Sequence, residues 1–262
     1  MEKIIGVAHI HSRFSYDGKL SLPELKSLFQ KNNLRFALVS EHEDDFDEKK
    51  WIALVEECQK LSDDSFLFIP GLEINYAGGH VLCFGLNQPI SYMKGIETLK
   101  EANKAGALIV FAHPHRSRYR VGEELQQIIN GVEIWNSHYD GKWSPRFLSY
   151  KLWQKVNRED KKIFAFAGLD FHDLHHLHGP RLEVASSFSI EAILKALISG
   201  SFVIKKDEKI ISAFPDLNMF PLFIKSFLSL CILGGYKFAG NIFSFFPKSW
   251  KRKIKLSLRK NL

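Results

Sequence analysis

The stretch Ile4-Ile5-Gly6-Val7-Ala8-His9-Ile10-His11 places two histidines at the end of an apolar run. A short run that is rich in β-branched residues is typical of a buried strand, and residues 4–10 are predicted to form one. Residues two apart in a strand project to the same side, so His9 and His11 can bind one ion together. One such pair is a weak signal by itself, because polar residues also end strands for purely structural reasons.

The same arrangement recurs along the chain, where histidines and acids follow further apolar runs. They are Glu41 and His42 after the predicted strand 36–40, Glu73 after 66–69, His113 after 108–112, and Asp170 with His172 after 163–167. His80 differs, because it opens the predicted strand 80–86. The carboxyl ends of parallel strands point to one shared face, so these side chains are expected to converge. Imidazole together with carboxylate suits Zn, Mn or Fe, and the sequence therefore predicts a metal site.

Longer amphipathic stretches separate several of these strands. The predicted helices cover 22–32, 50–61, 95–105, 122–130, 147–156 and 190–198, and two more strands cover 132–136 and 202–205. Ser21 is a candidate N-cap for the first helix, with Pro23 and Glu24 in its first turn. This β/α alternation predicts a parallel sheet of about seven or eight strands, closed or open, with helices outside it.

Composition narrows the class of protein. The chain has 262 residues, of which 45% are hydrophobic and 25% are charged, and this excludes wholesale disorder. Its three cysteines are odd in number and widely spaced, which disfavours a disulfide framework and favours a reducing compartment. The first three residues lead directly into the apolar run, without a secretory signal, so a cytoplasmic location is expected.

The net charge of +7 is unevenly distributed. Residues 1–208 hold 26 basic and 28 acidic residues, a net of −2, whereas residues 209–262 hold ten basic residues and one acid, a net of +9. The body of the protein therefore has no excess positive charge for a nucleic-acid backbone, and nucleic acid is expected only as a substrate. We divide the chain into a barrel over residues 1–208 and a hydrophobic, basic extension over residues 209–262.

The ordered motifs between residue 9 and about residue 205 resemble those of the PHP (polymerase and histidinol phosphatase) family of metal-dependent phosphoesterases. They are His9-Ile10-His11-Ser12 with Ser15-Tyr16-Asp17-Gly18, Ser40-Glu41-His42, Gly71-Leu72-Glu73, Gly79-His80, His113-Pro114 and Gly168-Leu169-Asp170-Phe171-His172. Glu41 stands where the family usually has Asp, and Glu serves there if that position only orients His42. The resemblance implies an α/β fold that is a distorted (β/α)7 TIM-like barrel. Residues 209–262 would then form a C-terminal helical appendage to this barrel.

The resemblance also implies three divalent metal ions, which would be Zn, Mn or Fe. One ion would bind His9, His11, Glu73 and Asp170. Glu73 would bridge to a second ion, held also by His80 and His113, and the third would take Asp17, His42 and His172. Three ions bring about +6 and three carboxylates about −3, so with a bridging hydroxide about +2 remains to complement a phosphate dianion. We therefore expect a metal-bridging hydroxide to hydrolyse a phosphate ester, which would be a phosphomonoester, a nucleotide or a short oligonucleotide.

Other residues near the motifs are candidates for contact with a small phosphorylated substrate. Arg116 can grip a phosphate through its fork of donors, and His115 can protonate a leaving alcohol, although a solvated arginine and a hydrogen-bonding histidine are open alternatives. The further phosphate-binding candidates are Arg13, Lys19 and Arg181. His138 is ambiguous, Glu133 is expected to face the barrel interior, and the loop with His175, His176 and His178 is interpreted as solvated rather than as a lid or a metal site.

The C-terminal extension has a character of its own. Residues 222–246 contain only Lys225 and Lys237 as charges, and residues 247–262 contain seven basic residues and no acid. A membrane-spanning helix needs ~20 mostly apolar residues, and the two lysines with Gly234-Gly235 interrupt this stretch. Two interpretations stay open: a segment bound peripherally to an anionic membrane at its inner face, and a helical hairpin packed on the barrel.

Two other functions compete with phosphate-ester hydrolysis. An amidohydrolase-type metal hydrolase also has two histidines on a barrel strand, but it usually needs a metal-bridging lysine, and only Lys205 lies at a predicted strand end. A non-catalytic metal-binding module tethered to a membrane surface would lack some of the ligands. A proofreading role is disfavoured because the chain has no polymerase-sized partner domain, and the oligomeric state stays open.

Overall fold

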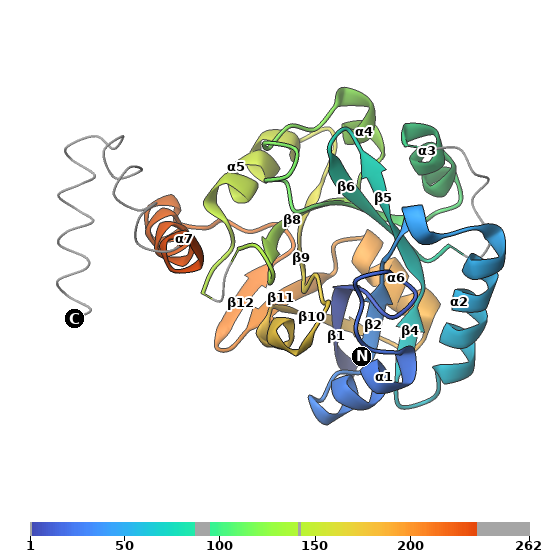
Figure 1. Cartoon of the computed structure of the whole chain (residues 1–262). Coiled ribbons are helices and arrows are strands. Elements are labelled where there is room, and N and C mark those ends of the chain that lie inside the picture. Colours follow the sequence, from blue (N-terminus) through green and yellow to red (C-terminus); the bar gives the residue numbers. More distant parts are fainter. Residues whose placement is uncertain (1, 87–94, 141–142, 235–262) are drawn as a thin grey trace.

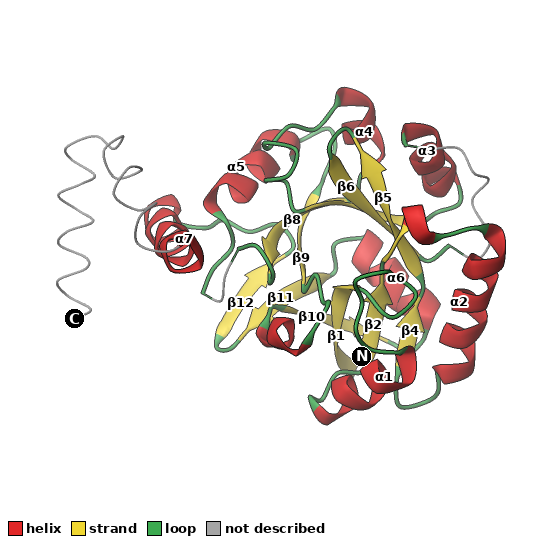
Figure 2. Ribbon diagram, viewed as in Figure 1, coloured by secondary structure: helices red, strands yellow, loops and turns green. Residues whose placement is uncertain are grey.

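The computed structural model describes residues 2–86, 95–140 and 143–234. They form an α/β fold in which the strands make two six-stranded sheets with helices around them (Figures 1 and 2). The strands are β1 (Glu2–Ile10), β2 (Phe36–Val39), β3 (Glu41–His42), β4 (Leu67–Ile69), β5 (Gly71–Tyr76), β6 (Gly79–Phe84), β7 (Leu108–Ala112), β8 (Gly131–Asn136), β9 (Phe164–Gly168), β10 (Arg181–Ser186), β11 (Phe202–Lys206) and β12 (Lys209–Ser212). The helices are α1 (Leu22–Lys31), α2 (Glu48–Leu61), α3 (Ile96–Lys104), α4 (Glu123–Ile128), α5 (Phe147–Val156), α6 (Ile190–Ile198) and α7 (Met219–Gly234).

The local signals place the helices accurately. α5 and α6 begin and end at the predicted residues, and the other four predicted helices differ by at most two residues at either end. Ser21 is the N-cap of α1, and its backbone N–H donates to the Glu24 carboxylate at 2.7 Å. This hydrogen bond satisfies the Ser21 amide, which would otherwise lack a partner at the start of the helix.

Strand direction corrects the prediction of a parallel sheet. The sheet orders are β12-β11-β10-β1-β2-β4 and β3-β5-β6-β7-β8-β9, and β6 runs antiparallel to both β5 and β7. β10, β11 and β12 also form antiparallel pairs. β5 and β6 are joined by Ala77 and Gly78 alone, both at positive φ, and so short a connection makes a hairpin rather than a crossover.

The two sheets are joined by the chain itself and by hydrogen bonds. Only Ser40 separates β2 in one sheet from β3 in the other, and only Pro70 separates β4 from β5. In addition, the His11 amide donates to the Phe171 carbonyl at 3.0 Å, and the Phe171 amide donates to the His9 carbonyl at 2.9 Å. These bonds join the end of β1 to the segment that follows β9. The closed (β/α)7 barrel stays a prediction, with which these junctions are compatible.

Two apolar clusters form the core. One packs the strands against α1 to α5, and the other packs strands of both sheets against each other and against α6. Successive side chains of a strand point to opposite faces, so Leu38 joins the second cluster and Val39 the first. Strands that are buried on both faces hold their ends rigidly, and this rigidity positions the polar residues that follow them.

The extension begins inside the sheet. β12 pairs with β11, so residues 209–212 continue the hairpin, and the division at residue 208 stays a prediction. α7 lies beside α5 (Figure 1), where the Phe147 amide donates to the Ser226 hydroxyl at 3.1 Å. None of the helices in the described part of the chain is long and apolar enough to cross a membrane. Residues 235–262 lie outside the described residues, so the predicted contact with an anionic membrane is still a prediction.

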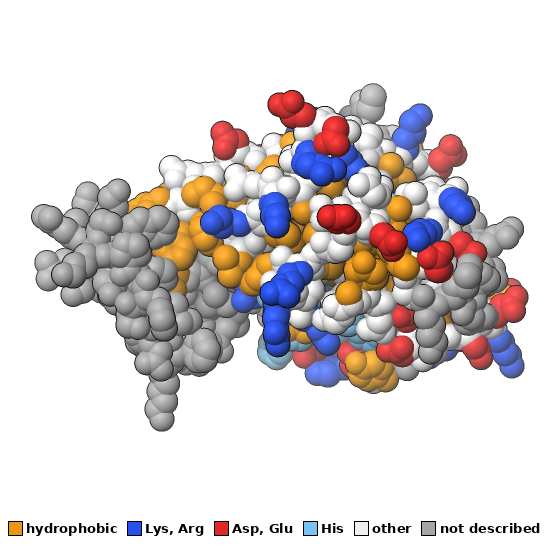
Figure 3. Space-filling model, turned by 90° about the horizontal axis from the view of Figure 1, so that it is seen from above, with side chains coloured by type: hydrophobic (Ala, Val, Ile, Leu, Met, Phe, Trp, Pro, Cys, Tyr) orange, Lys and Arg blue, Asp and Glu red, His pale blue; other side chains and the backbone are white. Residues whose placement is uncertain are grey.

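Surface charge agrees with the charge balance of the sequence. On the face seen in Figure 3, acidic and basic side chains are interspersed with apolar ones, and neither sign dominates. This mixture is what a net charge of −2 over residues 1–208 leads us to expect.

Candidate metal centre

The structure brings together all nine side chains that the motifs single out. Eight of them make three overlapping groups whose ligand atoms lie within 4.8 Å of one another: His9, Glu73 and His113; His9, His11 and Asp170; and His11, Asp17, His42 and His172. His80 joins them through Glu73, because its Nδ1 atom lies 2.5 Å from Glu73 Oε1. The residues come from the ends of β1 and β3, from within β5, from the start of β6 and from the segments that follow β1, β7 and β9.

Glu73 is at the centre of the cluster, and its two carboxylate oxygens face different imidazoles. Oε1 lies 2.8 Å from His113 Nε2 and 3.4 Å from His9 Nε2. Oε2 lies 3.1 Å from His42 Nδ1 and 3.5 Å from His11 Nε2. A carboxylate with one oxygen turned to each of two ligand groups is placed to bridge two cations.

The two aspartates complete the cluster on either side. Asp170 Oδ1 lies 3.5 Å from His9 Nε2 and 3.6 Å from His11 Nε2. Asp17 Oδ2 lies 3.0 Å from His172 Nε2 and 3.2 Å from His42 Nε2. The cluster therefore contains three carboxylates, each of them shared by at least two imidazoles.

Electrostatics show that the carboxylates need positive charge beside them. Burial alone would raise the pKa of Glu73, but the surrounding histidines, His9 foremost, hold its pKa well below the usual value. Burial likewise opposes charge on His42, yet Asp17 and Glu73 raise its pKa to about 10. His11 is the exception, since burial lowers its pKa to about 4. Cations bound among these groups would replace the imidazole protons as the compensating charge.

Buried atoms without partners test whether metal ions fit. His9 Nε2, both ring nitrogens of His11, His113 Nδ1 and Asp17 Oδ1 are buried, and none of them has a hydrogen-bond partner among the described residues. An unsatisfied buried polar atom costs about 1–3 kcal/mol, so such a concentration is unfavourable unless a ligand occupies it. Imidazole nitrogens with carboxylate oxygens are the donors that Zn, Mn and Fe take in proteins. The residues therefore fit divalent metal ions.

Glu41 has a different role from the predicted one. Its buried carboxylate accepts hydrogen bonds from the Ser12 amide at 2.9 Å and from the hydroxyls of Ser12 and Ser15. The Ser15 hydroxyl in turn accepts from the His42 amide at 3.0 Å. Burial raises the pKa of Glu41 to about 7, although the hydrogen bonds from Ser12 and Ser15 act to lower the pKa. Glu41 therefore fixes the loop that leads to Asp17, and its hydrogen-bonded link to His42 runs through Ser15 to the backbone amide rather than to the imidazole.

Of the predicted substrate-binding residues, two lie at the rim of the cluster. His115 packs on the Tyr139 ring at 4.4 Å, and burial with nearby Arg146 lowers the pKa of His115 to about 4. A neutral imidazole is a poor general acid at pH 7, which weighs against the predicted protonation of the leaving group. Arg116 is exposed beside Tyr139 and within its hydrogen-bonding reach.

The three other basic candidates are already paired with protein groups. Lys19 Nζ lies 2.9 Å from Asp173 Oδ2, next to His172, and so it stays close to the cluster. Arg13 donates to the Lys19 carbonyl at 3.1 Å and faces Glu24 of α1. Arg181 donates to the Asn32 carbonyl at the end of α1, and the structure does not bring it to the cluster.

A row of stacked rings at the rim was not predicted. His138 stacks between Tyr139, at 4.4 Å, and His176, at 4.5 Å between ring centroids. His138, His172 and His176 could also form a metal group by distance. However, His176 Nδ1 accepts the His172 amide at 3.1 Å, and both ring nitrogens of His172 face Asp170 or Asp17. His176 Nδ1 is thus occupied, and His172 turns one ring nitrogen to the Asp170 carbonyl and the other to Asp17 rather than to His138, so we interpret the row as a wall of the site.

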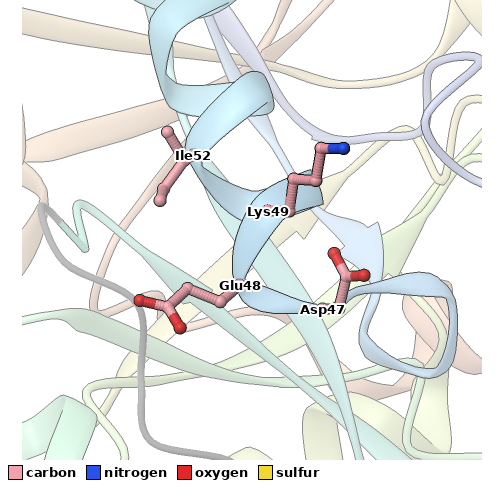
Figure 4. A pocket seen from close by; sticks show the side chains of 4 residues that line it. All are labelled: Asp47, Glu48, Lys49 and Ile52. Atoms are coloured by element: carbon pink, nitrogen blue, oxygen red, sulfur yellow. The ribbon is translucent and has the colours of Figure 1, made fainter.

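Hollows elsewhere on the described surface do not involve the predicted residues. One lies at the start of α2 and is lined by Asp47, Glu48, Lys49 and Ile52, whose side chains point in different directions (Figure 4). Another lies between α6 and the end of α3. Neither brings metal ligands together.

Similarity to known proteins is found by comparison of structures but not of sequences. No family model matches the sequence, and a search of curated proteins finds no match either. Among solved structures, the chain is similar to the crystal structure of a two-domain protein from Bacteroides vulgatus that contains a predicted PHP-like metal-dependent phosphoesterase. The TM-score is 0.62 at 20% identity, over 87% of this chain and 70% of that chain. This chain shares its α/β fold with that protein. The resemblance to PHP proteins that the motifs predicted is thus confirmed at the level of the fold.

Proposed function

We propose that the protein is a metal-dependent hydrolase of phosphate esters. The observation that carries the proposal is the position of Glu73, whose two oxygens each face a separate set of imidazoles. Mononuclear sites do not need a buried carboxylate of this kind, whereas metal-assisted phosphoryl transfer commonly uses neighbouring cations. The substrate is a small phosphorylated molecule: a phosphomonoester, a nucleotide or a short oligonucleotide.

Three divalent ions are proposed, each with its own side chains. His9, His11, Glu73 and Asp170 would hold the first, Glu73, His80 and His113 the second, and Asp17, His42 and His172 the third. Ions bound there supply Lewis-acid polarisation of the phosphoryl oxygens and neutralise negative charge that develops in the transition state.

The charge of the loaded site supports a phosphate rather than a neutral substrate. Three ligand carboxylates, those of Asp17, Glu73 and Asp170, together with the buried Glu133 beside His9, offset about +6 from three ions, so positive charge is still in surplus. Arg116 adds an exposed cationic side chain at the rim, and Lys19, although paired with Asp173, lies close to the cluster. We assign them to binding and orienting the phosphate group, which guanidinium donors can grip in a bidentate manner.

The amidohydrolase alternative is less well supported. Such a site usually needs a metal-bridging lysine at a strand end. Lys205, the one lysine at a predicted strand end, forms an ion pair with Glu183 at 2.9 Å on the neighbouring strand.

A direct assay tests the proposal. The protein is purified and its metal content measured, and phosphate release from an aryl phosphate is followed before and after chelation. A panel of mononucleotides, sugar phosphates, phosphotyrosine and short RNA follows, with Mn, Zn or Fe restored. Turnover that is lost on chelation and regained with metal supports the proposal, and the absence of metal-dependent turnover across the panel would refute it.

A further inference from the structure

We infer that Glu133 and Asn136 of β8 are positioning residues that hold His9, His113 and Asp170 ready to bind metal. This inference rests on the metal site proposed above. It concerns a carboxylate and an amide outside the nine ligands, both of which are completely buried.

The three ligands need such support because their backbones are strained. His9 has φ of 63°, Asp170 has 50° and His113 has 23°, all in the left-handed region that residues other than glycine avoid. Such a backbone conformation is unfavourable and persists only where its surroundings determine it. All three strained residues contact Glu133 or Asn136 through hydrogen bonds.

Glu133 holds two of them. Its Oε1 atom lies 3.1 Å from His9 Nδ1, and its Oε2 atom accepts from the His113 backbone amide at 2.8 Å. A carboxylate can only accept, so Nδ1 of His9 must carry the proton. The lone pair of His9 is thereby placed on Nε2, which faces Glu73 and Asp170 in the cluster.

Asn136 holds the third. Its side-chain amide donates to Glu133 Oε2 at 2.9 Å and to Asp170 Oδ2 at 3.3 Å. Asp170 Oδ1 is left to face His9 and His11. The side-chain oxygen Oδ1 of Asn136 accepts hydrogen bonds from the backbone amides of His138 and Tyr139, so every polar atom of this side chain is used.

Gly168 in β9 shows how closely these groups approach. A Cβ atom there would lie 2.3 Å from Glu133 Oε1 and 2.7 Å from His9 Cβ. A side chain at this position would separate Glu133 from His9, and this explains the glycine that ends β9.

The isosteric substitution Glu133→Gln distinguishes a positioning role from a purely structural one. In Glu133→Gln, one oxygen still accepts from His113 and Asn136, which leaves the new NH₂ group facing His9 Nδ1. Two donors cannot pair, so His9 shifts its proton to Nε2 and loses the lone pair that faces the cluster. The variant should therefore fold normally and bind metal poorly.

The experiment titrates Mn²⁺ into metal-free wild-type protein, Glu133→Gln, Asn136→Ser and a control, Glu183→Gln. Glu183 is an acid of β10 that pairs with Lys3 and Lys205 away from the cluster. We expect Glu133→Gln to bind at least about 10-fold more weakly, at a melting temperature close to that of the metal-free wild type, and the control to be unchanged. Asn136→Ser, which loses the donor to Asp170, should show a smaller loss and keeps the test valid if Glu133→Gln does not fold.

A second readout is spectroscopic. In the Zn²⁺-loaded wild type, ¹⁵N NMR should show His9 protonated at Nδ1. Protonation at Nε2, or wild-type affinity in both variants, would overturn the inference. A wild-type protein that binds no Mn²⁺ or Zn²⁺ would instead refute the proposed function, and the inference would fall with it.

Discussion

His42 and Glu73 are direct partners in the parallel pairing of β3 and β5, and His42 Nδ1 lies 3.1 Å from Glu73 Oε2. The other ring nitrogen of His42 lies 3.2 Å from Asp17 Oδ2. One imidazole therefore joins the central carboxylate to the acid of the loop after β1. A two-residue strand is long enough to create this link, because the register fixes both side chains.

His42→Ala should abolish metal-dependent turnover, since the third proposed ion would lose one of its three ligands and Glu73 a neighbour. We expect a loss of at least about 100-fold in kcat/KM. Asp170→Ala should do the same. Steady-state kinetics on an aryl phosphate measure both, with His176→Ala as the control, because His176 lies in the ring row and is not a proposed ligand. Normal turnover in His42→Ala would remove it from the site.

Glu41→Ala should destabilise the metal-free protein by about 2–4 kcal/mol, because the buried donors of Ser12 and Ser15 would lose their acceptor. Urea unfolding measures the change in the free energy of unfolding. Glu48→Ala, at an exposed position in the first turn of α2, is the control and should change the stability little. An unchanged midpoint for Glu41→Ala would mean that the loop does not depend on this carboxylate.

The buried carboxyl of Asp140 makes the free energy of unfolding depend on pH. Burial raises the pKa of Asp140 to about 7, against its ion pair with Arg146, whereas an unfolded Asp has a pKa near ~3.9. Between these two values the folded state binds the proton and the unfolded state does not. The free energy of unfolding should therefore fall as pH rises from about 4 to about 7, by about 2–4 kcal/mol from this group. Comparison with Asp140→Asn isolates this contribution, and parallel pH profiles for the two proteins would disprove it.

The basic C-terminus should bind anionic membranes. Full-length protein should co-sediment with phosphatidylserine-containing vesicles, less so in high salt, since each basic residue near the surface contributes about 1 kcal/mol. A chain truncated after Gly234 keeps α7 and its contact with α5 but lacks eight basic residues, and it should stay in the supernatant. Equal sedimentation of both chains would favour the packed hairpin instead.

Local signals explain what the sequence predicts well. The limits of α5 and α6 follow from amphipathic spacing. Most of the ligands follow from their positions at the ends of apolar runs, whereas Asp17 and His80 follow from the resemblance to the PHP motifs. Amphipathic spacing and strand-end position both depend on residues that are close in the chain. Because buried strands hold their ends in fixed positions, strand-end residues converge even when the exact sheet order is not known.

Short turns and long-range pairing account for the rest. The reversals of β6 and β12 depend on two-residue connections, which are local but are not interpreted as hairpins in the sequence, whereas β10 depends on pairing with the distant β1. Arg181 lies near a motif in sequence but is bound to the end of α1. Asn136 carries no motif, and only the fold reveals that it joins Glu133 to Asp170.

The most direct test of the central claim is anomalous X-ray scattering from crystals grown with manganese or zinc. Three anomalous peaks are expected, with Glu73 between the first two and all nine side chains turned toward them. Side chains turned away from one another around a site without any peak, at saturating metal, would contradict it.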